Sequence, residues 1–163
     1  MNTFNGEGKT SLKTYAHKHR ISVSRKSSFC AAHFLRDYNG ACANMHGHTW
    51  HYRVTITGYV NDILCDTAQE RIGVPNSMLL DFKVLKGWMR EFEDMVDHKV
   101  LNNVEGINAA SNPTAEFLCI FIAEMMKTKL NNYKHQGHVH ASSYVSEVSV
   151  WESKDCKATW KGE

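Results

Sequence analysis

Two histidines in this sequence are placed so that both could bind one metal ion. His46 and His48 are separated by one glycine and begin a run in which apolar and polar residues alternate. A period of two is typical of a half-buried strand, where residues two apart point to the same side. Both imidazoles share the parity of the apolar residues that follow, among them Trp50 and Tyr52. They should therefore project inward from the start of a strand.

A third histidine comes from the preceding segment. From Ile21 onward the odd positions are mostly apolar, and His33 continues that set near its end. Three neutral imidazoles with an open fourth position are typical of catalytic zinc, whereas structural zinc is usually closed by cysteines. Each histidine alone would be interpreted as an ordinary turn or core residue. The matched parity of all three favours a metal site.

Cys42 is the best candidate for a reactive thiol. It lies in a polar loop four residues before His46, and a nearby dication favours a thiolate. The alternative is a small buried hydrophobic residue, which fits Cys30 and Cys119 better.

Three further side chains could take part in chemistry. Asp97 precedes His98 at the expected end of a helix, and a carboxylate beside an imidazole can orient it for proton transfer. The alternative for His98 is an interaction with the helix dipole. Glu152 has inward parity on the last strand and could accept two adjacent N–H groups, such as an aminopyrimidine edge. Its alternative is solvation beyond the strand end.

A second group of histidines competes with the first. His135, His138 and His140 lie in a polar stretch without an alternating apolar pattern. We interpret them as solvent-exposed.

The elements that position these residues can be predicted from periodicity and capping signals. Strands are expected at about 20–34, 48–59 and 144–152, with a possible short strand at 77–80 and a loop or hairpin at 131–143. One helix should begin after Asp81 as its N-cap, with an apolar stripe from Phe82 to Val96. A second should begin with Asn112 as N-cap and Pro113 in the first helical position. This order predicts an α+β fold with an antiparallel sheet.

Composition limits the remaining possibilities. The chain has 163 residues, 42% hydrophobic and 22% charged, which suits one globular domain over 20–163 preceded by a flexible arm at 1–19. A net charge of +2 implies no strong nucleic-acid field, and no apolar run is long enough for a membrane span. The five cysteines are scattered and no signal peptide is visible, so a reducing cytoplasm is expected.

Together these residues resemble the family of 6-pyruvoyltetrahydropterin and 6-carboxytetrahydropterin synthases. The similarity follows the family's order over about residues 20–155. The matching pieces are Phe29-Cys30-Ala31-Ala32-His33, Cys42-x-x-x-His46-Gly47-His48, Asp81-Phe82, Asp97-His98 with Leu101-Asn102, Asn112-Pro113-Thr114-Ala115-Glu116 and Val150-Trp151-Glu152-Ser153.

The resemblance implies the tunnelling fold and a set of site residues. The fold is an antiparallel four-stranded sheet with two helices on one face; the sheets of several subunits join into a barrel, usually in a hexamer, with sites between subunits. The implied zinc ligands are His33, His46 and His48. The implied substrate and catalytic residues are Cys42 for proton abstraction, Asp97 and His98 as a relay from a neighbouring subunit, Glu152 as the pterin anchor, and Thr114 and Glu116 in the pterin pocket.

The implied substrate is 7,8-dihydroneopterin triphosphate. The short gap between Cys42 and His46 resembles the carboxy branch, whose product is 6-carboxy-5,6,7,8-tetrahydropterin, with release of acetaldehyde and triphosphate, on the path to queuosine. The alternatives are pyruvoyl synthesis, a side-chain aldolase activity, or a non-catalytic zinc or pterin-binding module. Candidates for triphosphate contacts are Arg25, Lys26 and Arg36.

Overall fold

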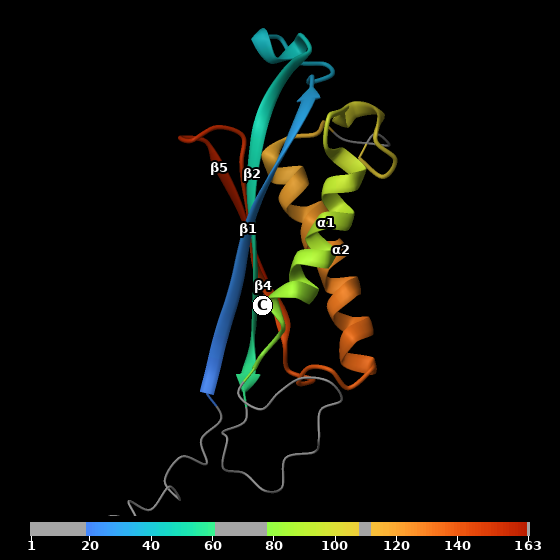
Figure 1. The fold of residues 1–163 in the computed structure, drawn as a ribbon. Coiled ribbons are helices and arrows are strands. Elements are labelled where there is room, and N and C mark those ends of the chain that lie inside the picture. Colours follow the sequence, from blue (N-terminus) through green and yellow to red (C-terminus); the bar gives the residue numbers. More distant parts are fainter. Residues whose placement is uncertain (1–18, 61–77, 108–111, 163) are drawn as a thin grey trace, which may run out of the picture.

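Two long antiparallel strands form the centre of the molecule (Figure 1). The computed structural model describes residues 19–60, 78–107 and 112–162. Strand β1 (His19–His33) pairs with β2 (His46–Val60) along their whole length, from His19 opposite Val60 to His33 opposite His46. The loop between them contains a short 3₁₀ helix, η2 (Ala41–Ala43), at the top of Figure 1.

Three shorter strands complete one mixed sheet in the order β3-β1-β2-β4-β5. Strand β4 (Tyr144–Trp151) pairs antiparallel with β2, β5 (Lys157–Lys161) pairs antiparallel with β4, and β3 (Lys99–Val100) runs parallel to β1. The predicted α+β class is confirmed, but the prediction of four antiparallel strands is wrong. Strand β3, with two residues, is too short to give a periodic signal, and β5 lies in a short charged stretch after Ser153 for which the sequence predicts no strand.

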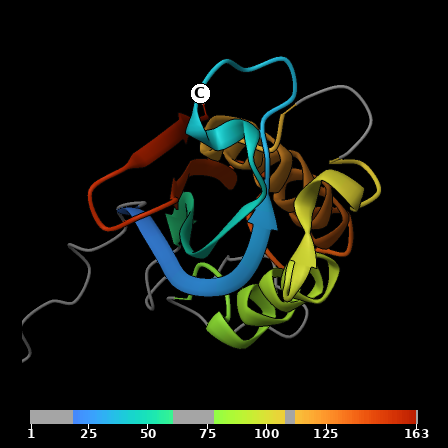
Figure 2. The same ribbon diagram turned by 90° about the horizontal axis from the view of Figure 1, so that it is seen from above.

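Two helices cover one face of this sheet, as expected (Figure 2). Helix α1 (Phe82–Val96) packs against β1, and α2 (Ala115–His135) packs against β4 and β5. Asp81 caps α1 as predicted, because its carboxylate accepts the Lys83 N–H at 2.7 Å. The predicted apolar stripe of α1 is buried except at its first residue, Phe82, which is 53% exposed.

Helix α2 differs from prediction at both ends. Thr114, and not Asn112, is its N-cap, and Pro113 precedes the cap. At the other end the helix continues to His135, so no hairpin occupies 131–143, and residues 78–80 form a bend, not a strand. A second 3₁₀ helix, η3 (Leu101–Asn103), follows β3.

The core lies between the sheet and the helices. The inward side chains of β2 are fully buried, as their parity predicts; these are Trp50, Tyr52, Val54 and Ile56. Burial of each such side chain contributes about 1.5–3 kcal/mol relative to exposure. The β1–β2 hairpin is therefore held firmly against the helices. This packing fixes the pairing register of β1 and β2, including the residues at the loop end of the hairpin.

Some predictions lie outside the described residues. They concern the flexible arm before His19 and the first residue, Ser77, of the possible short strand at 77–80. Among the helices of the described residues, none is long and apolar enough to cross a membrane.

Candidate metal centre and its surroundings

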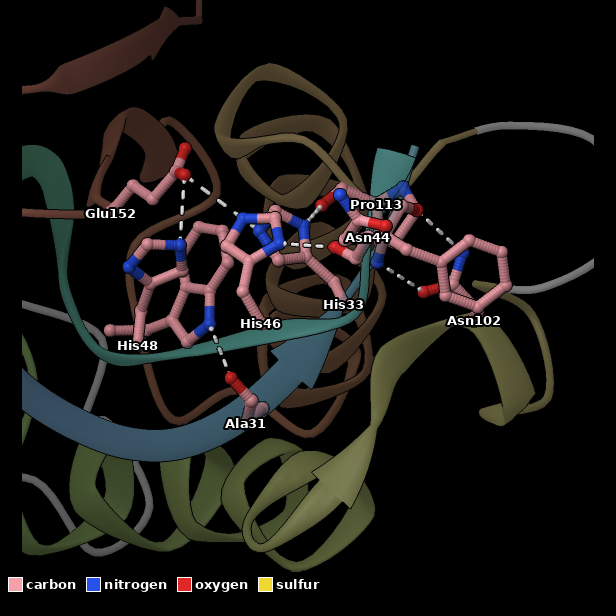
Figure 3. A network of polar contacts seen from close by, with 10 residues as sticks. Ala31, His33, Asn44, His46, His48, Asn102, Pro113 and Glu152 are labelled. Atoms are coloured by element: carbon pink, nitrogen blue, oxygen red, sulfur yellow. Dashed lines mark hydrogen bonds and ion pairs between the residues drawn. The ribbon is translucent and has the colours of Figure 1, made fainter. Parts of the chain in front are cut away.

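Four side chains converge at the loop end of the hairpin (Figure 3). One ligand atom from each of His33, His46, His48 and Glu152 can be chosen so that all four lie within 4.8 Å of one another. The first three are the predicted metal ligands. The group combines imidazole nitrogens with one carboxylate oxygen, a donor set suited to a divalent transition metal.

Strand register brings the three histidines together. His33 pairs with His46, and His48 pairs with Ala31, so all three imidazoles lie on the inward face of two neighbouring strands. The ring centroid of His33 lies 4.5 Å from that of His46 and 5.3 Å from that of His48. A slip of one residue would turn one strand's imidazoles to the opposite face.

Main-chain carbonyls orient two of the rings. His33 Nδ1 lies 2.8 Å from the carbonyl oxygen of Pro113, and His46 Nδ1 lies 2.7 Å from that of Asn44. A carbonyl can only accept, so each Nδ1 must carry the proton, which leaves each Nε2 lone pair available. Such outer hydrogen bonds fix the tautomer of metal-binding histidines.

Two buried nitrogen atoms test whether the group fits a metal. Nε2 of His33 and Nε2 of His48 are both buried and have no hydrogen-bond partner. The Glu152 carboxylate oxygen lies 3.0 Å from His48 Nε2 and 3.7 Å from His33 Nε2, without hydrogen-bond geometry at either. Burial is the largest influence on His33 and lowers its pKa, although the Pro113 hydrogen bond raises it, so the ring is neutral near pH 7. Neutral imidazoles with unsatisfied lone pairs fit a bound cation.

Glu152 lies directly against these histidines. It follows the last residue of β4 and is 29% exposed at its side chain. Parity predicts the face of the sheet on which Glu152 lies, but not how close its carboxylate comes to the imidazoles. The observed position suits either a fourth metal ligand or a carboxylate that holds a substrate beside the metal.

Two asparagines fix the segment between His33 and Cys42. The Asn102 amide accepts the Phe34 N–H at 3.0 Å and donates to the Phe34 carbonyl at 2.9 Å. Asn112 does the same for Arg36, at 2.7 and 3.0 Å. Each side chain thus replaces a neighbouring strand. The sequence signal was present, because both asparagines lie in the matched motifs, but the sequence interpretation gave Asn112 a capping role.

Cys42 lies within η2 and is half-buried. Its carbonyl accepts the Leu35 N–H at 2.8 Å, which ties the Cys42 loop back to the segment held by the asparagines. Among the described residues, Cys42 does not join the metal-binding group. The main chain of Cys42 is therefore tied to the segment that follows His33.

Asp97 and His98 lie together at the end of α1, as predicted. His98 Nδ1 is 2.9 Å from Asp97 Oδ2, and the His98 side chain is 80% exposed. Asp97 Oδ1 accepts the Cys30 N–H at 2.8 Å; this bond, followed by the His98 hydrogen bond and charge, holds the Asp97 pKa below its usual range despite some desolvation. His98 has a φ of 57°, an uncommon left-handed conformation, and its N–H donates to the Cys30 carbonyl.

The remaining candidates occupy the ends of α2. The Thr114 hydroxyl accepts the Phe117 N–H at 3.3 Å, and Glu116 is exposed in the first turn. Of the competing histidines, His135 is exposed, but His138 and His140 are half-buried, so the prediction for those two is wrong. His138 stacks on Tyr133 with ring centroids 4.4 Å apart.

Fold and site together define an α+β protein with a histidine-rich metal-binding group at one end of a β-hairpin. Residues 22–163 match the sequence family described as 6-pyruvoyl tetrahydropterin synthase. The chain belongs to this family.

Named relatives agree with this assignment. The chain is 34% identical over 151 residues to a 6-carboxy-5,6,7,8-tetrahydropterin synthase of Haemophilus influenzae, covering 82% of this chain and 93% of that protein. A Synechocystis protein of the same name is 32% identical over 101 residues, covering 61% of this chain and 70% of that protein. The solved 6-pyruvoyl tetrahydropterin synthase of Caenorhabditis elegans superposes with a TM-score of 0.67 at 25% identity, covering 89% of this chain and 97% of that chain. The predictions of this family, and of an enzyme of the 6-carboxytetrahydropterin synthase type, are confirmed.

Proposed function

We propose that the protein is a zinc-dependent 6-carboxytetrahydropterin synthase. It would convert 7,8-dihydroneopterin triphosphate to 6-carboxy-5,6,7,8-tetrahydropterin, releasing acetaldehyde and triphosphate as a lyase step toward queuosine. The observation that carries the proposal is the convergence of three imidazoles, two of them with buried Nε2 atoms that have no hydrogen-bond partner, in a chain whose relatives bear this name.

Zinc is proposed as the resident ion. His33, His46 and His48 would hold it through Nε2, since Nδ1 of the first two is engaged by carbonyls. A bound zinc ion would supply Lewis-acid polarisation of the substrate's side-chain hydroxyls. Three histidines with room for a further ligand are the pattern of catalytic zinc.

Cys42, Asp97 and His98 would move the protons. We assign the proton-abstracting role to the Cys42 thiolate, whose loop is tied to the segment after His33. The relay would be the Asp97–His98 pair of a neighbouring subunit, because the exposed His98 ring faces away from its own core. Asp97 would hold His98 in orientation and favour its protonated form.

Glu152 is proposed as the pterin anchor. Its carboxylate could accept two parallel N–H bonds from the aminopyrimidine edge, which would place the ring next to the metal-binding group. Thr114 and Glu116 would line the pocket from the start of α2.

A second candidate is 6-pyruvoyltetrahydropterin synthesis. It is favoured by the family description and by the solved relative from Caenorhabditis elegans. The gap of three residues between Cys42 and His46 favours the carboxy reaction, as do the names of the two bacterial relatives.

Assembly is part of the proposal. Among the described residues, β3 covers only Ala31 and Ala32 of β1, so the edge of β1 before them has no strand partner. Within the same described part of the chain, the outer edge of β5 has no strand partner either. Exposed edges invite pairing with other chains, and a cytoplasmic homohexamer of barrels, each chain contributing one catalytic domain over residues 20–163, would cover them.

A product assay tests the proposal. Purified zinc-loaded protein is incubated with dihydroneopterin triphosphate, and the products are separated and identified by mass. Acetaldehyde with the 6-carboxy product is the expected result. A 6-pyruvoyl product would establish the second candidate, and binding without turnover would reduce the protein to a zinc and pterin-binding module.

A further inference from the structure

The sheet face turned away from the helices is strongly basic. Strand alternation places five cations there: Arg20, Lys26, Arg53, Lys157 and Lys161. Among the described strand residues of this face, Glu147 is the one carboxylate. The formal charge of the face is therefore +4, although the whole chain carries only +2.

Three of these cations surround one aromatic ring. From the centroid of the Trp151 ring, Lys26 Nζ lies at 5.3 Å, Lys157 Nζ at 5.6 Å and Arg53 Cζ at 5.8 Å. They come from three different strands, β1, β5 and β2. Like charges gathered in this way repel, and the attraction of each cation to the indole at an exposed site offsets only part of that repulsion.

The single carboxylate is already engaged. Glu147 Oε1 accepts from Arg53 Nη2 at 2.8 Å and from the Ser149 hydroxyl at 3.0 Å. Desolvation raises the Glu147 pKa, but these hydrogen bonds and the charges of Arg53 and Lys157 outweigh it, so the group stays ionised. Glu147 therefore balances Arg53, and the exposed ammonium groups of Lys26 and Lys157 remain available to a ligand.

Polar groups extend this surface toward the other end of the sheet. An open cavity of about 460 Å³ adjoins Glu147, and its lining includes two cations, Arg20 and Lys161, and the hydroxyl side chains of Ser22, Thr55, Thr57 and Ser146. The hydroxyls of Ser22, Thr57 and Ser146 bond one another and the Thr55 carbonyl, so it is the two cations of this cavity that extend the basic surface.

We propose that Lys26, Arg53 and Lys157 around Trp151 form a binding site for an inorganic polyphosphate. The metal-binding group lies close to this site. Glu152 follows Trp151 at the end of β4, and its carboxylate lies 3.0 Å from His48 Nε2. The Trp151 side chain lies on the face turned away from the helices, whereas the metal-binding group lies on the helix-covered face. The choice of this ligand rests on the proposed function, because the proposed reaction releases triphosphate.

Tryptophan fluorescence of the zinc-loaded protein measures binding of inorganic triphosphate directly. The signal should change on titration and should disappear in Trp151→Phe, and affinity should fall steeply with added salt. Removing two of the three cations in the double variant Lys26→Gln/Lys157→Gln should weaken binding at least about tenfold, because each cation attracts the polyphosphate at close range.

The matched control is Lys83→Gln/Lys86→Gln on α1. It removes the same charge, and Lys86 lines a different cavity, where Arg25 and Arg90 are balanced by the carboxylates of Glu93, Asp94 and Asp97. Binding in this control should change less than about twofold, since screened charges elsewhere contribute little. Equal weakening in both doubles, stronger weakening in the control, or no binding by the native protein would overturn the site.

A second titration distinguishes the source of the phosphate chain. A nucleoside triphosphate should bind no more tightly than inorganic triphosphate if the chain alone is recognised. A preference above about tenfold, or 1.4 kcal/mol, for the nucleotide would overturn that ligand assignment. These measurements need no turnover, so their failure is distinct from failure of the product assay.

Discussion

The chain contains two histidine sites that are built in opposite ways. At the hairpin end, three imidazoles are held inward by strand register, and carbonyl groups of the same chain fix the orientation of two of them. At the end of α1, His98 is 80% exposed and its partners are Asp97 and the main chain of Cys30. The first group brings its histidines together within one chain, whereas the second presents its imidazole to the outside.

This difference separates binding from catalysis. Metal binding should need only one folded chain, because all three proposed histidine ligands lie on the hairpin of that chain. Proton transfer in the proposed reaction should need two chains, because the exposed pair would complete a neighbour's site. The predictions below test this division, beginning with the largest effect.

Replacement of a metal ligand should have the largest consequence. His48→Ala removes a ligand from the centre of the group and should reduce bound zinc to background and abolish turnover. Elemental analysis of the purified protein measures this. His51→Ala, on the opposite face of the same strand, is the matched control and should keep its zinc; full zinc content in His48→Ala would contradict the ligand set.

Loss of either proposed proton-transfer group should abolish most activity and leave zinc in place. Cys42→Ala and His98→Ala should each lower kcat by roughly 10²–10⁴, the usual contribution of a positioned acid or base. Activity assays with parallel zinc analysis measure this. Retained activity in Cys42→Ala would refute its role.

Mixing these two inactive variants tests the intersubunit arrangement. Co-assembled chains should regain about a quarter of the wild-type sites, since random association joins an intact Cys42 to an intact His98 in that fraction. Absence of any recovery, with mixed assembly verified by two affinity tags, would place both groups in one chain.

Glu152→Gln tests the proposed anchor. Loss of a charged hydrogen-bond acceptor costs about 1.5–3 kcal/mol, so pterin affinity should fall roughly 10- to 100-fold with zinc retained. Calorimetric titration with a pterin, beside zinc analysis, measures both. Loss of zinc with unchanged pterin affinity would instead make Glu152 a metal ligand.

Asn112→Ala tests the support behind the metal site. It removes two hydrogen bonds to Arg36 and should lower the free energy of unfolding by about 1–2 kcal/mol. Because Pro113 orients His33, zinc affinity should also fall, by roughly 10- to 100-fold. Urea denaturation and chelator competition measure these. Asn103→Ala, an exposed neighbour of Asn102, should leave both unchanged; equal effects in the two variants would refute the role.

The smallest effect concerns the charge of Asp97. Because the Cys30 hydrogen bond and the His98 interactions lower its folded pKa, the charge stabilises the fold above its ordinary value of 3.8. This contribution is lost as pH falls through the lower folded pKa. Asp97→Asn should therefore be less stable than wild type near neutral pH, and the two free energies of unfolding should converge in acid. Urea midpoints measured across this pH range would show this. Parallel curves would contradict the shift.

Much of the metal-binding group could be predicted because alternation in a strand specifies a face. The parity of His33, His46 and His48 was enough to place their imidazoles together. Glu152 shows the limit of such reasoning, since parity gives no depth or distance, and its contact with His48 depends on where β4 ends relative to β2.

The N-cap of α2 could not be predicted because two candidate capping residues lie close together, and an asparagine can also bind the main chain of another segment. Asparagine and threonine both cap helices, and the structure gives that role to Thr114 while Asn112 binds the main chain of Arg36. Strand β5 was missed because its alternation spans only five residues, between a charged turn and the chain end. Its Trp160 packs against the core nonetheless.

The hairpin consists of a long paired stem and a short loop at its end. The stem supplies all three imidazoles, and β1 and β2 pair without interruption from His19 opposite Val60 to His33 opposite His46. Cys42 belongs to the loop. Insertions or deletions in this loop could move the thiol relative to a bound substrate and leave the metal-binding group intact. A protein of this fold could therefore change the outcome of its reaction by altering one loop.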